Sequence, residues 1–486
     1  MESIKIFIEK YNEVYVKVHC NDQGVLYELS EYFTFAVPNA KFTPAFKNKV
    51  WDGKIRLYNV MTRLLYGGLT AYIEQFATER GYTVEYQYDT GAASFSIEEA
   101  RVFCSKLELT HAPRDYQLEA FVHAIRQSRS LLLSPTASGK SFIIFLTMMY
   151  VLSQRPGKCL IVVPTTSLVS QMSSDFESYS PYGKGIAHRI MAGESKDTNK
   201  RVIVSTWQSI YKQPRAWFDQ FDIVIGDEAH HFKAKSLTNI LTKMEQCPYR
   251  FGFTGTLDGT HTHKLVLEGL FGAVRKVTTT AELIEQKHLA AFKIKGIVLS
   301  YPEADRKHVT SLQYKDEIDW IVRDERRNKF ITNLVLSLKG NTLVLFQYVE
   351  KHGKVLYSLL AGRQNVYFVS GQVDADVREE IRKIVETQTD AIIVASFGTF
   401  STGVNIKNLH NVVFSSPSKS RTRTLQSIGR GLRKSDMKEE ATLYDIADDL
   451  SWKSKKNHTL NHFVERVKMY GDEKFDYKLY NVSVKG

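Results

Sequence analysis

Short runs of apolar residues alternate with longer amphipathic stretches over most of this chain, from about residue 101 onward. Each run has the length of a strand and ends in a small or polar cluster. That pattern is typical of parallel strands buried on both faces, with functional loops at their carboxyl ends. It predicts two consecutive α/β units, residues 101–290 and 291–486. The runs are SLLLSP, CLIVVP, RVIVST, FDIVIGDE and RFGFTGT in the first unit, and KIKGIVLS, NTLVLFQY, NVYFVSG, AIIVAS and NVVFSS in the second.

Residues 1–100 follow a different pattern and are predicted to form a separate small α/β domain. Val14–Cys20 alternates as a half-buried strand does, and Tyr82–Tyr88 is a second such segment. Between them, Gly68–Tyr82 has the character of a helix closed by a glycine. A chain of 486 residues is also too long to fold around a single hydrophobic core, because single cores stop growing at roughly 250–300 residues.

The charge of the chain is unevenly distributed. The net charge is +12 with an isoelectric point near 9.2, but residues 1–100 carry −3, residues 101–290 carry +7 and residues 291–486 carry +8. This excess predicts a polyanionic partner for the two larger units. The alternative is charge that serves solubility alone.

Cysteine usage and the amino terminus exclude several classes of protein. The four cysteines are far apart in sequence and form no CxxC pair, which argues against a zinc site or a disulfide framework and fits a reducing compartment. The first residues, MESIKIFIEKYNEV, resemble neither a signal peptide nor a transit peptide. No apolar run approaches the ~20 residues of a membrane span. We therefore expect a cytoplasmic protein.

The loop after the first apolar run has the composition of a phosphate-binding loop. Residues 134–141 read SPTASGKS and precede a helical stretch, so phosphates can bind the exposed amides at the positive end of that helix. Lys140 is expected to reach the β- and γ-phosphates of ATP, and the Ser141 hydroxyl to hold Mg²⁺. Ser134 stands where the strict pattern has glycine, and a plain glycine-containing turn is the alternative. The predicted ATP-binding residues here are Thr136, Ala137, Ser138, Gly139, Lys140 and Ser141.

The run FDIVIGDE delivers two adjacent acids to the end of a predicted strand. Asp227 is expected to hold the metal ion, because a hard cation prefers oxygen ligands. Glu228 is expected to orient or deprotonate the attacking water. A solvated turn is the alternative. Together with Lys140, this pair predicts an ATP-hydrolysing enzyme that uses Mg²⁺.

In order along the chain, these segments resemble the motifs of superfamily two helicases. The loop TASGKS is similar to motif I, and Asp227-Glu228-Ala229-His230 to motif II. The family implies two tandem RecA-like parallel-sheet domains as a helicase core, here with the small α/β domain added at the amino terminus. ATP is then expected between the two units, with nucleic acid crossing both.

Further matches in the first unit supply the remaining expected roles. Arg114 and Gln117 resemble the adenine-reading segment. Val163–Thr166 and Ser205–Ser209 resemble strand-binding loops, whose hydroxyls suit a phosphate backbone. For each isolated Ser/Thr cluster, helix capping is the alternative. The resemblance implies nucleic-acid contacts by Thr165, Thr166, Ser205, Thr206 and Gln208, and coupling roles for His230, Thr254 and Thr256, with Gly255 where motif III usually has alanine.

The second unit has no phosphate-binding loop, so one ATP per chain is expected. Residues 426–433, QSIGRGLR, resemble motif VI, and on a helix Arg430 and Arg433 share a face. Arginine suits the charge that develops on the γ-phosphoryl group, while surface charge is the alternative. Resemblance to motifs IV, V and VI adds Gln426 as catalytic, Gly403 and Asn405 as nucleotide contacts, and Ser396, Thr399 and Phe346 (or Tyr348) as strand contacts. Many relatives have Asp where Asn405 stands.

Two segments outside the motor motifs are also notable. Residues 40–58 interleave basic and aromatic side chains, with Asp52 as the one acid. This composition suits backbone contact and base stacking, although a hairpin with core aromatics is the alternative. Residues 452–471 are expected to form a basic amphipathic helix that packs on the motor, with a duplex contact as the alternative. The candidate nucleic-acid contacts of residues 40–58 are Lys47, Lys49, Trp51, Lys54 and Arg56.

The amino-terminal segment with WDGKIRLY, followed directly by this motor, resembles recombination and repair helicases of T-even bacteriophages. That resemblance implies an ATP-dependent DNA helicase that unwinds or branch-migrates forks, four-way junctions and R-loops in recombination, repair and replication restart. A phage-encoded protein would act in the host cytoplasm, as a monomer or weak oligomer. The alternatives are an RNA helicase, a remodelling ATPase that does not unwind, and a non-hydrolysing nucleic-acid-binding protein with a relict fold.

Overall fold

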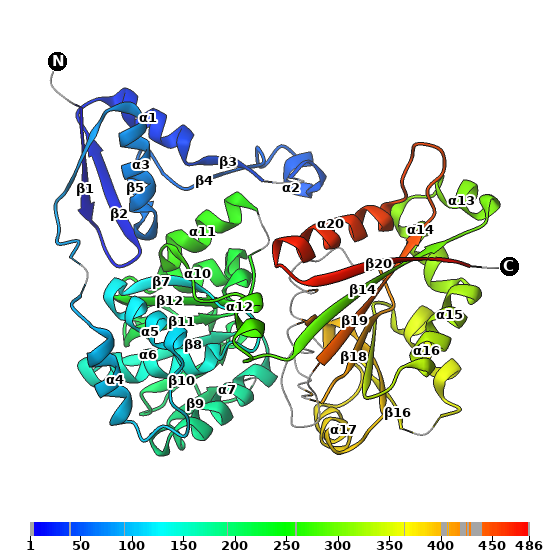
Figure 1. The fold of residues 1–486 in the computed structure, drawn as a ribbon. Helices are drawn as coiled ribbons and strands as arrows, with labels where there is room; N and C mark the ends of the chain where they lie inside the picture. Colours follow the sequence, from blue (N-terminus) through cyan, green and yellow to red (C-terminus); the bar gives the residue numbers. More distant parts are fainter. Residues whose placement is uncertain are drawn as a thin grey trace. The chain divides into compact units, whose positions relative to one another are not determined.

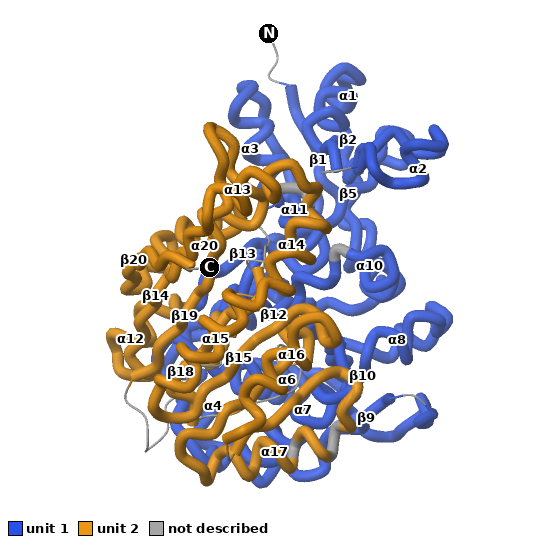
Figure 2. Tube along the Cα trace, turned by 90° about the vertical axis from the view of Figure 1, so that its right-hand side faces the viewer, with its two compact units in different colours: residues 1–134, 139–277 blue, residues 135–138, 278–486 orange. Residues whose placement is uncertain are grey.

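The structure is a computed structural model in which the chain divides into two compact units, residues 1–134 with 139–277 and residues 135–138 with 278–486 (Figure 2). The residues that the structure describes are 4–37, 40–91, 93–191, 193–257, 260–363, 365–399, 406, 408–417, 424, 427–428 and 440–484.

The first unit is built on a seven-stranded parallel sheet in the order β13-β7-β12-β11-β8-β10-β9 (Figure 1). All five strands predicted in this region are confirmed, because their apolar side chains are buried on both faces. Two edge strands were not predicted, the short β9 and the three-residue β13. The strands are β7 (Arg129–Leu133), β8 (Lys158–Val163), β9 (Ala187–Ile190), β10 (Val202–Thr206), β11 (Phe221–Asp227), β12 (Tyr249–Thr254) and β13 (Val274–Lys276).

Helices cover both faces of this sheet. One face packs against α5, α6 and α7, and the other against α8, α10 and α11, with inward side chains of each strand alternating between the two cores. The helices are α4 (Ile97–Ser105), α5 (Asp115–Gln127), α6 (Lys140–Gln154), α7 (Thr166–Tyr179), α8 (Trp207–Ile210), α9 (Arg215–Phe218), α10 (Lys235–Lys243) and α11 (His261–Phe271), with short turns η3 (Pro181–Gly183) and η4 (Ala229–Lys233).

The amino-terminal segment forms a second, mixed sheet in the order β5-β2-β1-β6, with α1 and α3 packed on it. A two-stranded ribbon of β3 and β4 leads away from this sheet and carries the small helix α2 at its end (Figure 1). The elements are β1 (Lys5–Lys10), β2 (Tyr15–Cys20), α1 (Gln23–Tyr32), β3 (Thr34–Ala36), η1 (Ala40–Phe42), α2 (Pro44–Lys47), β4 (Lys54–Arg56), β5 (Leu64–Tyr66), η2 (Gly67–Leu69), α3 (Thr70–Arg80) and β6 (Thr83–Tyr86).

This amino-terminal sheet shares one hydrophobic core with the large sheet of the first unit. Phe76 of α3 and Leu270 of α11 belong to the same buried cluster. Polar contacts add to it: the Tyr72 hydroxyl donates to the Glu268 carboxylate at 2.6 Å, and Asn12 Nδ2 donates to Glu245 at 2.9 Å. Glu268 is only 4 % exposed, so the hydrogen bond satisfies a carboxylate that water barely reaches. The amino-terminal segment is therefore anchored to α11.

Close backbone approach at Gly68 makes this anchoring sensitive to a single methyl group. A Cβ atom there would collide with the backbone carbonyl oxygen of Glu268, which cannot move without shifting α11. We expect Gly68→Ala to lower the free energy of unfolding by about 1–3 kcal/mol, the usual cost of overpacking. Thermal unfolding of the full chain measures this. Gly362→Ala is the control, because nothing lies within 4 Å of a Cβ added there, and an equal loss in both variants would contradict the expectation.

The second unit also contains a seven-stranded parallel sheet, in the order β16-β17-β15-β18-β19-β14-β20. The five predicted strands of this region are confirmed, and β19 and β20 were not predicted. The elements are α12 (Thr280–Glu285), β14 (Ala291–Ser300), α13 (Glu303–Val309), α14 (Tyr314–Arg323), α15 (Glu325–Ser337), β15 (Thr342–Phe346), η5 (Val349–Gly353), α16 (Lys354–Leu360), β16 (Val366–Val369), α17 (Ala375–Thr387), β17 (Ile392–Ser396), β18 (Asn411–Phe414), β19 (Glu440–Asp449), α20 (His458–Asp472) and β20 (Asp476–Ser483).

Helix α20 packs on the second unit through buried charges. Asp445 of β19 is fully buried and accepts from Arg466 Nε and Nη2, each at 2.8 Å. Glu317 of α14, 1 % exposed, accepts from the backbone nitrogens of His458 and Thr459 and so caps the first turn of the helix. The expected packing of this helix on the motor is confirmed. Phe463 lies on the buried face of the helix, while Leu460, Val464 and Val467 are half-buried.

Candidate functional site: a nucleotide site at the carboxyl end of the first sheet

The loop between β7 and α6 has the geometry of a phosphate-binding turn. Gly139, just before the first residue of α6, has a φ of 82°, in the left-handed region that favours glycine. A Cβ atom at this position would also collide with the side-chain amide of Gln117. Lys140 follows as the first residue of the helix, so its side chain and the first amides of α6 lie at the same end of the sheet.

Lys140 and Glu228 form an ion pair at this end of the sheet. The Nζ atom lies 3.1 Å from Glu228 Oε1, and both side chains are largely buried. Glu228 adopts a φ of 48°, which is uncommon for a residue with a side chain and costs about 1–3 kcal/mol. Such strain is typical of functional sites. The structure thus brings together residues separated by 88 positions in the sequence.

The two acids at the end of β11 differ in their electrostatic surroundings. Burial raises the pKa of Asp227 to about 6; the charge of Lys140 offsets part of this rise, and the neighbouring Glu228 carboxylate adds to it. Burial also acts to raise the pKa of Glu228, but Lys140 and His230 outweigh it and hold this pKa below its usual range. Glu228 is therefore a carboxylate at neutral pH, as a general base or a water-orienting group has to be.

The three residues expected to couple the motifs are in contact. His230 Nδ1 lies 2.9 Å from Thr254 Oγ1 and 3.4 Å from Glu228 Oε2. The Thr254 hydroxyl donates to the backbone carbonyl of Thr256 at 2.9 Å. A chain of polar contacts therefore leads from the acid at the end of β11 to the loop that follows β12.

The segment expected to read adenine lies beside the phosphate-binding turn. Gln117 is 5 % exposed, and its Oε1 accepts from the backbone nitrogen of Arg114 at 2.9 Å. The Arg114 guanidinium donates to the Tyr116 hydroxyl at 2.9 Å. The side chain of Gln117 is thus held at the start of α5, against Gly139 of the turn.

Two hydroxyls meet at the start of α6. Ser141 Oγ lies 2.6 Å from the Tyr179 hydroxyl, at the last residue of α7. Sequence analysis missed Tyr179, because it lies 38 residues from Ser141 and belongs to none of the motifs. The motif pattern contains no indication of this contact.

The expected strand-binding residues of the first unit divide into accessible and buried ones. Thr166 and Gln208 are exposed, and Thr165 is half-buried and caps α7. Thr206 is 4 % exposed and starts α8. Ser205 is completely buried, and its hydroxyl donates to the backbone carbonyl of Ile190. The expectation for the Ser205 side chain is corrected on this ground, because a hydroxyl used inside the sheet is not presented to a nucleic acid.

In the second unit, Phe346 also points into the interior. It is fully buried and stacks on Phe368, with ring centroids 5.5 Å apart, so its expected role as a strand contact is corrected. Tyr348, two residues later, is 36 % exposed and is the accessible aromatic at this strand end. Ser396 and Thr399 lie at the neighbouring strand end, with their hydroxyls 2.8 Å apart. Gly403, Asn405, Gln426, Arg430 and Arg433 lie outside the described residues.

The ribbon of residues 40–58 exposes the basic and apolar side chains that its sequence interleaves. Phe42 and Val50 are 65 % and 81 % exposed. The Arg56 guanidinium holds the pKa of Asp52 at about 2, so the one acid of the segment is paired with a base. Trp51 is half-buried and donates from Nε1 to the backbone carbonyl of Lys54 at 2.8 Å. The remaining candidate contacts, Lys47, Lys49, Lys54 and Arg56, are exposed.

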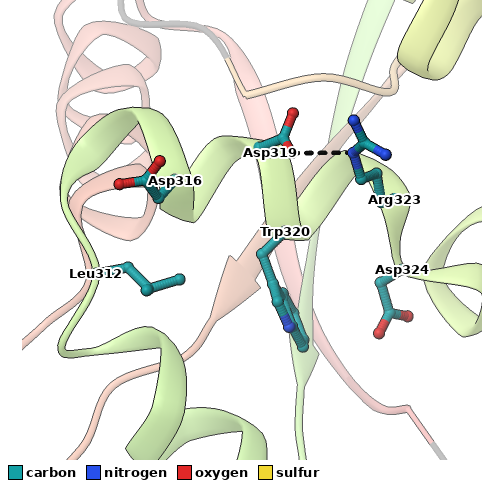
Figure 3. Close-up of a pocket in the computed structure, with 6 residues that line it drawn as sticks. All are labelled: Leu312, Asp316, Asp319, Trp320, Arg323 and Asp324. Carbon is teal, nitrogen blue, oxygen red and sulfur yellow. Dashed lines mark ion pairs between the residues drawn. The ribbon is translucent and has the colours of Figure 1, made fainter.

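A pocket of about 370 Å³ lies on the second unit, and none of the expected site residues lines it (Figure 3). Leu312 and Trp320 line it together with three aspartates and Arg323, which pairs with Asp319 at 2.9 Å. Its excess of carboxylates opposes phosphate binding, so we do not place a nucleotide there.

Two parallel seven-stranded sheets, one with a phosphate-binding turn and paired acids at its carboxyl end, define a motor ATPase of the helicase type. Comparisons with known proteins agree with this class. Residues 110–259 match the res subunit of type III restriction enzymes, and residues 326–435 match the helicase conserved C-terminal domain. Residues 3–87 match the N-terminal region of the DNA helicase UvsW.

Individual relatives identify the family within this class. The chain is 34 % identical to the ATP-dependent DNA helicase uvsW of Enterobacteria phage T4, over 99 % of this chain and 100 % of that protein. A crystal structure of T4 UvsW covers 99 % of this chain with a TM-score of 0.53. The DNA 3'-5' translocase XPB2 of Sulfurisphaera tokodaii is 24 % identical over 85 % of this chain and 95 % of its own length. This chain belongs to the UvsW family of ATP-dependent DNA helicases.

Family membership makes the protein an ATP-hydrolysing DNA helicase that binds nucleic acid. Over the described part of the chain, no helix is both long enough and apolar enough to span a membrane.

Proposed function

We propose that this helicase unwinds or branch-migrates branched DNA, including forks, four-way junctions and R-loops, in recombination, repair and replication restart. The observation that carries the proposal is the ribbon of residues 40–58, which presents exposed basic and apolar side chains on a domain anchored to the first sheet. Basic groups contact phosphates whatever the base sequence, and aromatic or apolar tips stack on or separate bases. Such a ribbon suits a junction, where bases are already partly unstacked.

For the ATP site, we assign roles to the residues that meet at the end of the first sheet. Lys140 contacts the β- and γ-phosphates, Glu228 orients the attacking water, and Gln117 with Arg114 binds the adenine. His230, Thr254 and Thr256 connect this site to the strand-binding loops. From the resemblance of their motifs, Gln426, Arg430 and Arg433 act on the γ-phosphoryl group, with Gly403 and Asn405 on the nucleotide.

Magnesium fits the oxygen donors present. Among the described residues, no three His, Cys, Asp or Glu side chains gather to hold a metal by themselves. Ser141 and Asp227 offer hard oxygen donors, and the buried Asp227 carboxylate favours a cation beside it. Mg²⁺ bound there with ATP would neutralise negative charge on the phosphate oxygens. A site completed by phosphates and water matches the coordination that Mg²⁺ prefers.

Nucleic-acid contacts are proposed for Thr165, Thr166, Thr206 and Gln208 in the first unit, and for Ser396, Thr399 and Tyr348 in the second. Hydroxyls and amides at strand ends contact the phosphate backbone and carry no base code. Sequence-independent translocation follows from such contacts.

The test compares ATPase and unwinding rates on fork, four-way junction, R-loop and linear substrates. Replacing Lys47 and Lys49 together with alanine should lower activity on junctions by about 5- to 50-fold at 150 mM salt, because each lost phosphate contact weakens binding. ATPase activity without DNA should not change. Lys5→Ala, an exposed lysine on β1, serves as the control. Equal preference for all four substrates in the unmodified chain would refute the branched-DNA proposal.

A further inference from the structure

We propose that Tyr179 is a positioning residue for the Ser141 hydroxyl, and through it for the Mg²⁺ ion of bound MgATP. The inference rests on the proposed role of Ser141 as a magnesium ligand. It adds a residue that belongs to none of the helicase motifs found in this chain.

The contact itself is short and well supported. The two hydroxyl oxygens are 2.6 Å apart, a strong O–H···O distance. The Tyr179 ring packs edge-on against Phe142, with centroids 4.9 Å apart, and lies tilted against Phe145 at 5.8 Å. Both phenylalanines belong to α6, the helix that begins with Lys140 and Ser141. The ring is therefore fixed to the helix that carries the ligand.

The backbone of Tyr179 is held from a second direction. Its carbonyl accepts from the backbone nitrogen of Thr110 at 2.9 Å and from the Thr110 hydroxyl at 3.3 Å. The next residue, Ser180, is buried and donates to the backbone carbonyl of Leu107 at 2.5 Å. Residues 107–110 lead directly into the segment with Arg114 and Gln117. Tyr179 thus connects the proposed adenine-reading segment to the proposed magnesium ligand.

The chemistry of a hydroxyl ligand explains why such a partner matters. A serine hydroxyl has one hydrogen and two lone pairs, and a lone pair can face a cation only when the hydrogen points elsewhere. Either hydroxyl can donate in the contact between Ser141 and Tyr179; when Ser141 donates to the Tyr179 oxygen, its hydrogen points away from the cation and a lone pair is left to face it. Groups that orient a metal ligand in this way typically change metal affinity by about 10- to 100-fold when removed.

The test is Tyr179→Phe in the full chain, which keeps the ring packing and removes the hydroxyl. Binding of a fluorescent ADP analogue is titrated with Mg²⁺ and, separately, measured in EDTA. We expect the Mg²⁺ concentration for half-maximal binding to rise about tenfold, while affinity in EDTA stays within twofold. The Mg²⁺ dependence of ATPase activity should shift in the same direction. Adding Tyr179→Phe to Ser141→Ala should cause no further shift, because the two residues act as one unit.

Tyr182→Phe is the matched control, because Tyr182 is 52 % exposed and its hydroxyl faces Glu108 at 3.3 Å instead of Ser141. An unchanged Mg²⁺ requirement in Tyr179→Phe would overturn the inference. So would an equal loss of affinity with Mg²⁺ and with EDTA, since that pattern marks a general structural role. If the proposed ATP site itself is wrong, the result differs from both of these outcomes, because Mg²⁺ would then not raise the nucleotide affinity of the unmodified chain.

Discussion

Replacing Glu228 with glutamine should abolish DNA-stimulated ATP hydrolysis while leaving ATP binding nearly intact. Glu228 is a carboxylate at neutral pH, because Lys140 and His230 outweigh the effect of burial on its pKa. Glutamine has the same shape but cannot accept a proton from the attacking water. General-base catalysis contributes about 10²- to 10⁴-fold, so we expect turnover to fall by at least about 100-fold. Steady-state ATPase assays with saturating DNA measure the loss.

The control for this variant is Glu177→Gln, an exposed glutamate of α7 in the same unit, which should retain full turnover. Fluorescent-nucleotide binding separates hydrolysis from affinity. Normal turnover by Glu228→Gln would remove this residue from the mechanism. A variant that neither binds nor hydrolyses ATP would instead indicate that the Lys140–Glu228 ion pair is required to form the site.

The largest effect on stability is expected from Arg466→Met in α20. Asp445 is fully buried, and it accepts two hydrogen bonds from Arg466 and a third from the Tyr470 hydroxyl at 2.7 Å. Removing the guanidinium leaves a buried carboxylate without a counter-charge. The usual cost of breaking one side of such a pair is about 3–5 kcal/mol. Calorimetric unfolding of the full chain should show a lower melting temperature for the transition that includes the second unit.

Lys468→Met provides the comparison on the same helix. Lys468 pairs with Glu465 at 2.9 Å, but both side chains are about two-thirds exposed. Exposed pairs contribute about 0–1 kcal/mol, so this variant should melt close to the unmodified chain. Similar melting temperatures for the two variants would show that burial of the Asp445–Arg466 pair has no energetic consequence.

Much of the fold could be predicted because its central strands are buried on both faces. Residues 159–163 of β8 and 343–346 of β15 are apolar without interruption. An amphipathic helix or a surface strand would have polar residues at regular intervals instead. The strands β19 and β20 of the second unit could not be found in this way. β20 is exposed along most of its length, and β19 carries Asp445 and Asp448, whose burial is stabilised by arginines distant in the sequence.

For the site, motif order predicted which residues meet but not which of them are accessible. Lys140, Glu228 and His230 lie together as their motifs imply. Ser205 and Phe346 match their motifs equally well, yet both are buried, because the sheet directs the side chains near the end of a strand into one core or the other. Side chains alternate between the two faces of a strand, but the short motifs did not show on which face each residue lies.

The position of β14 has a consequence for the synthesis of this protein. β14 lies between β19 and β20, so both of its edges pair with strands that are translated about 140 or more residues later. At about 5–20 residues per second, the ribosome takes at least about 7–28 s to supply those partners. Until then an apolar strand has two open edges, a form that readily joins other chains. The nascent second unit is therefore expected to depend on chaperones, whereas the sheet of the first unit is complete before β14 emerges.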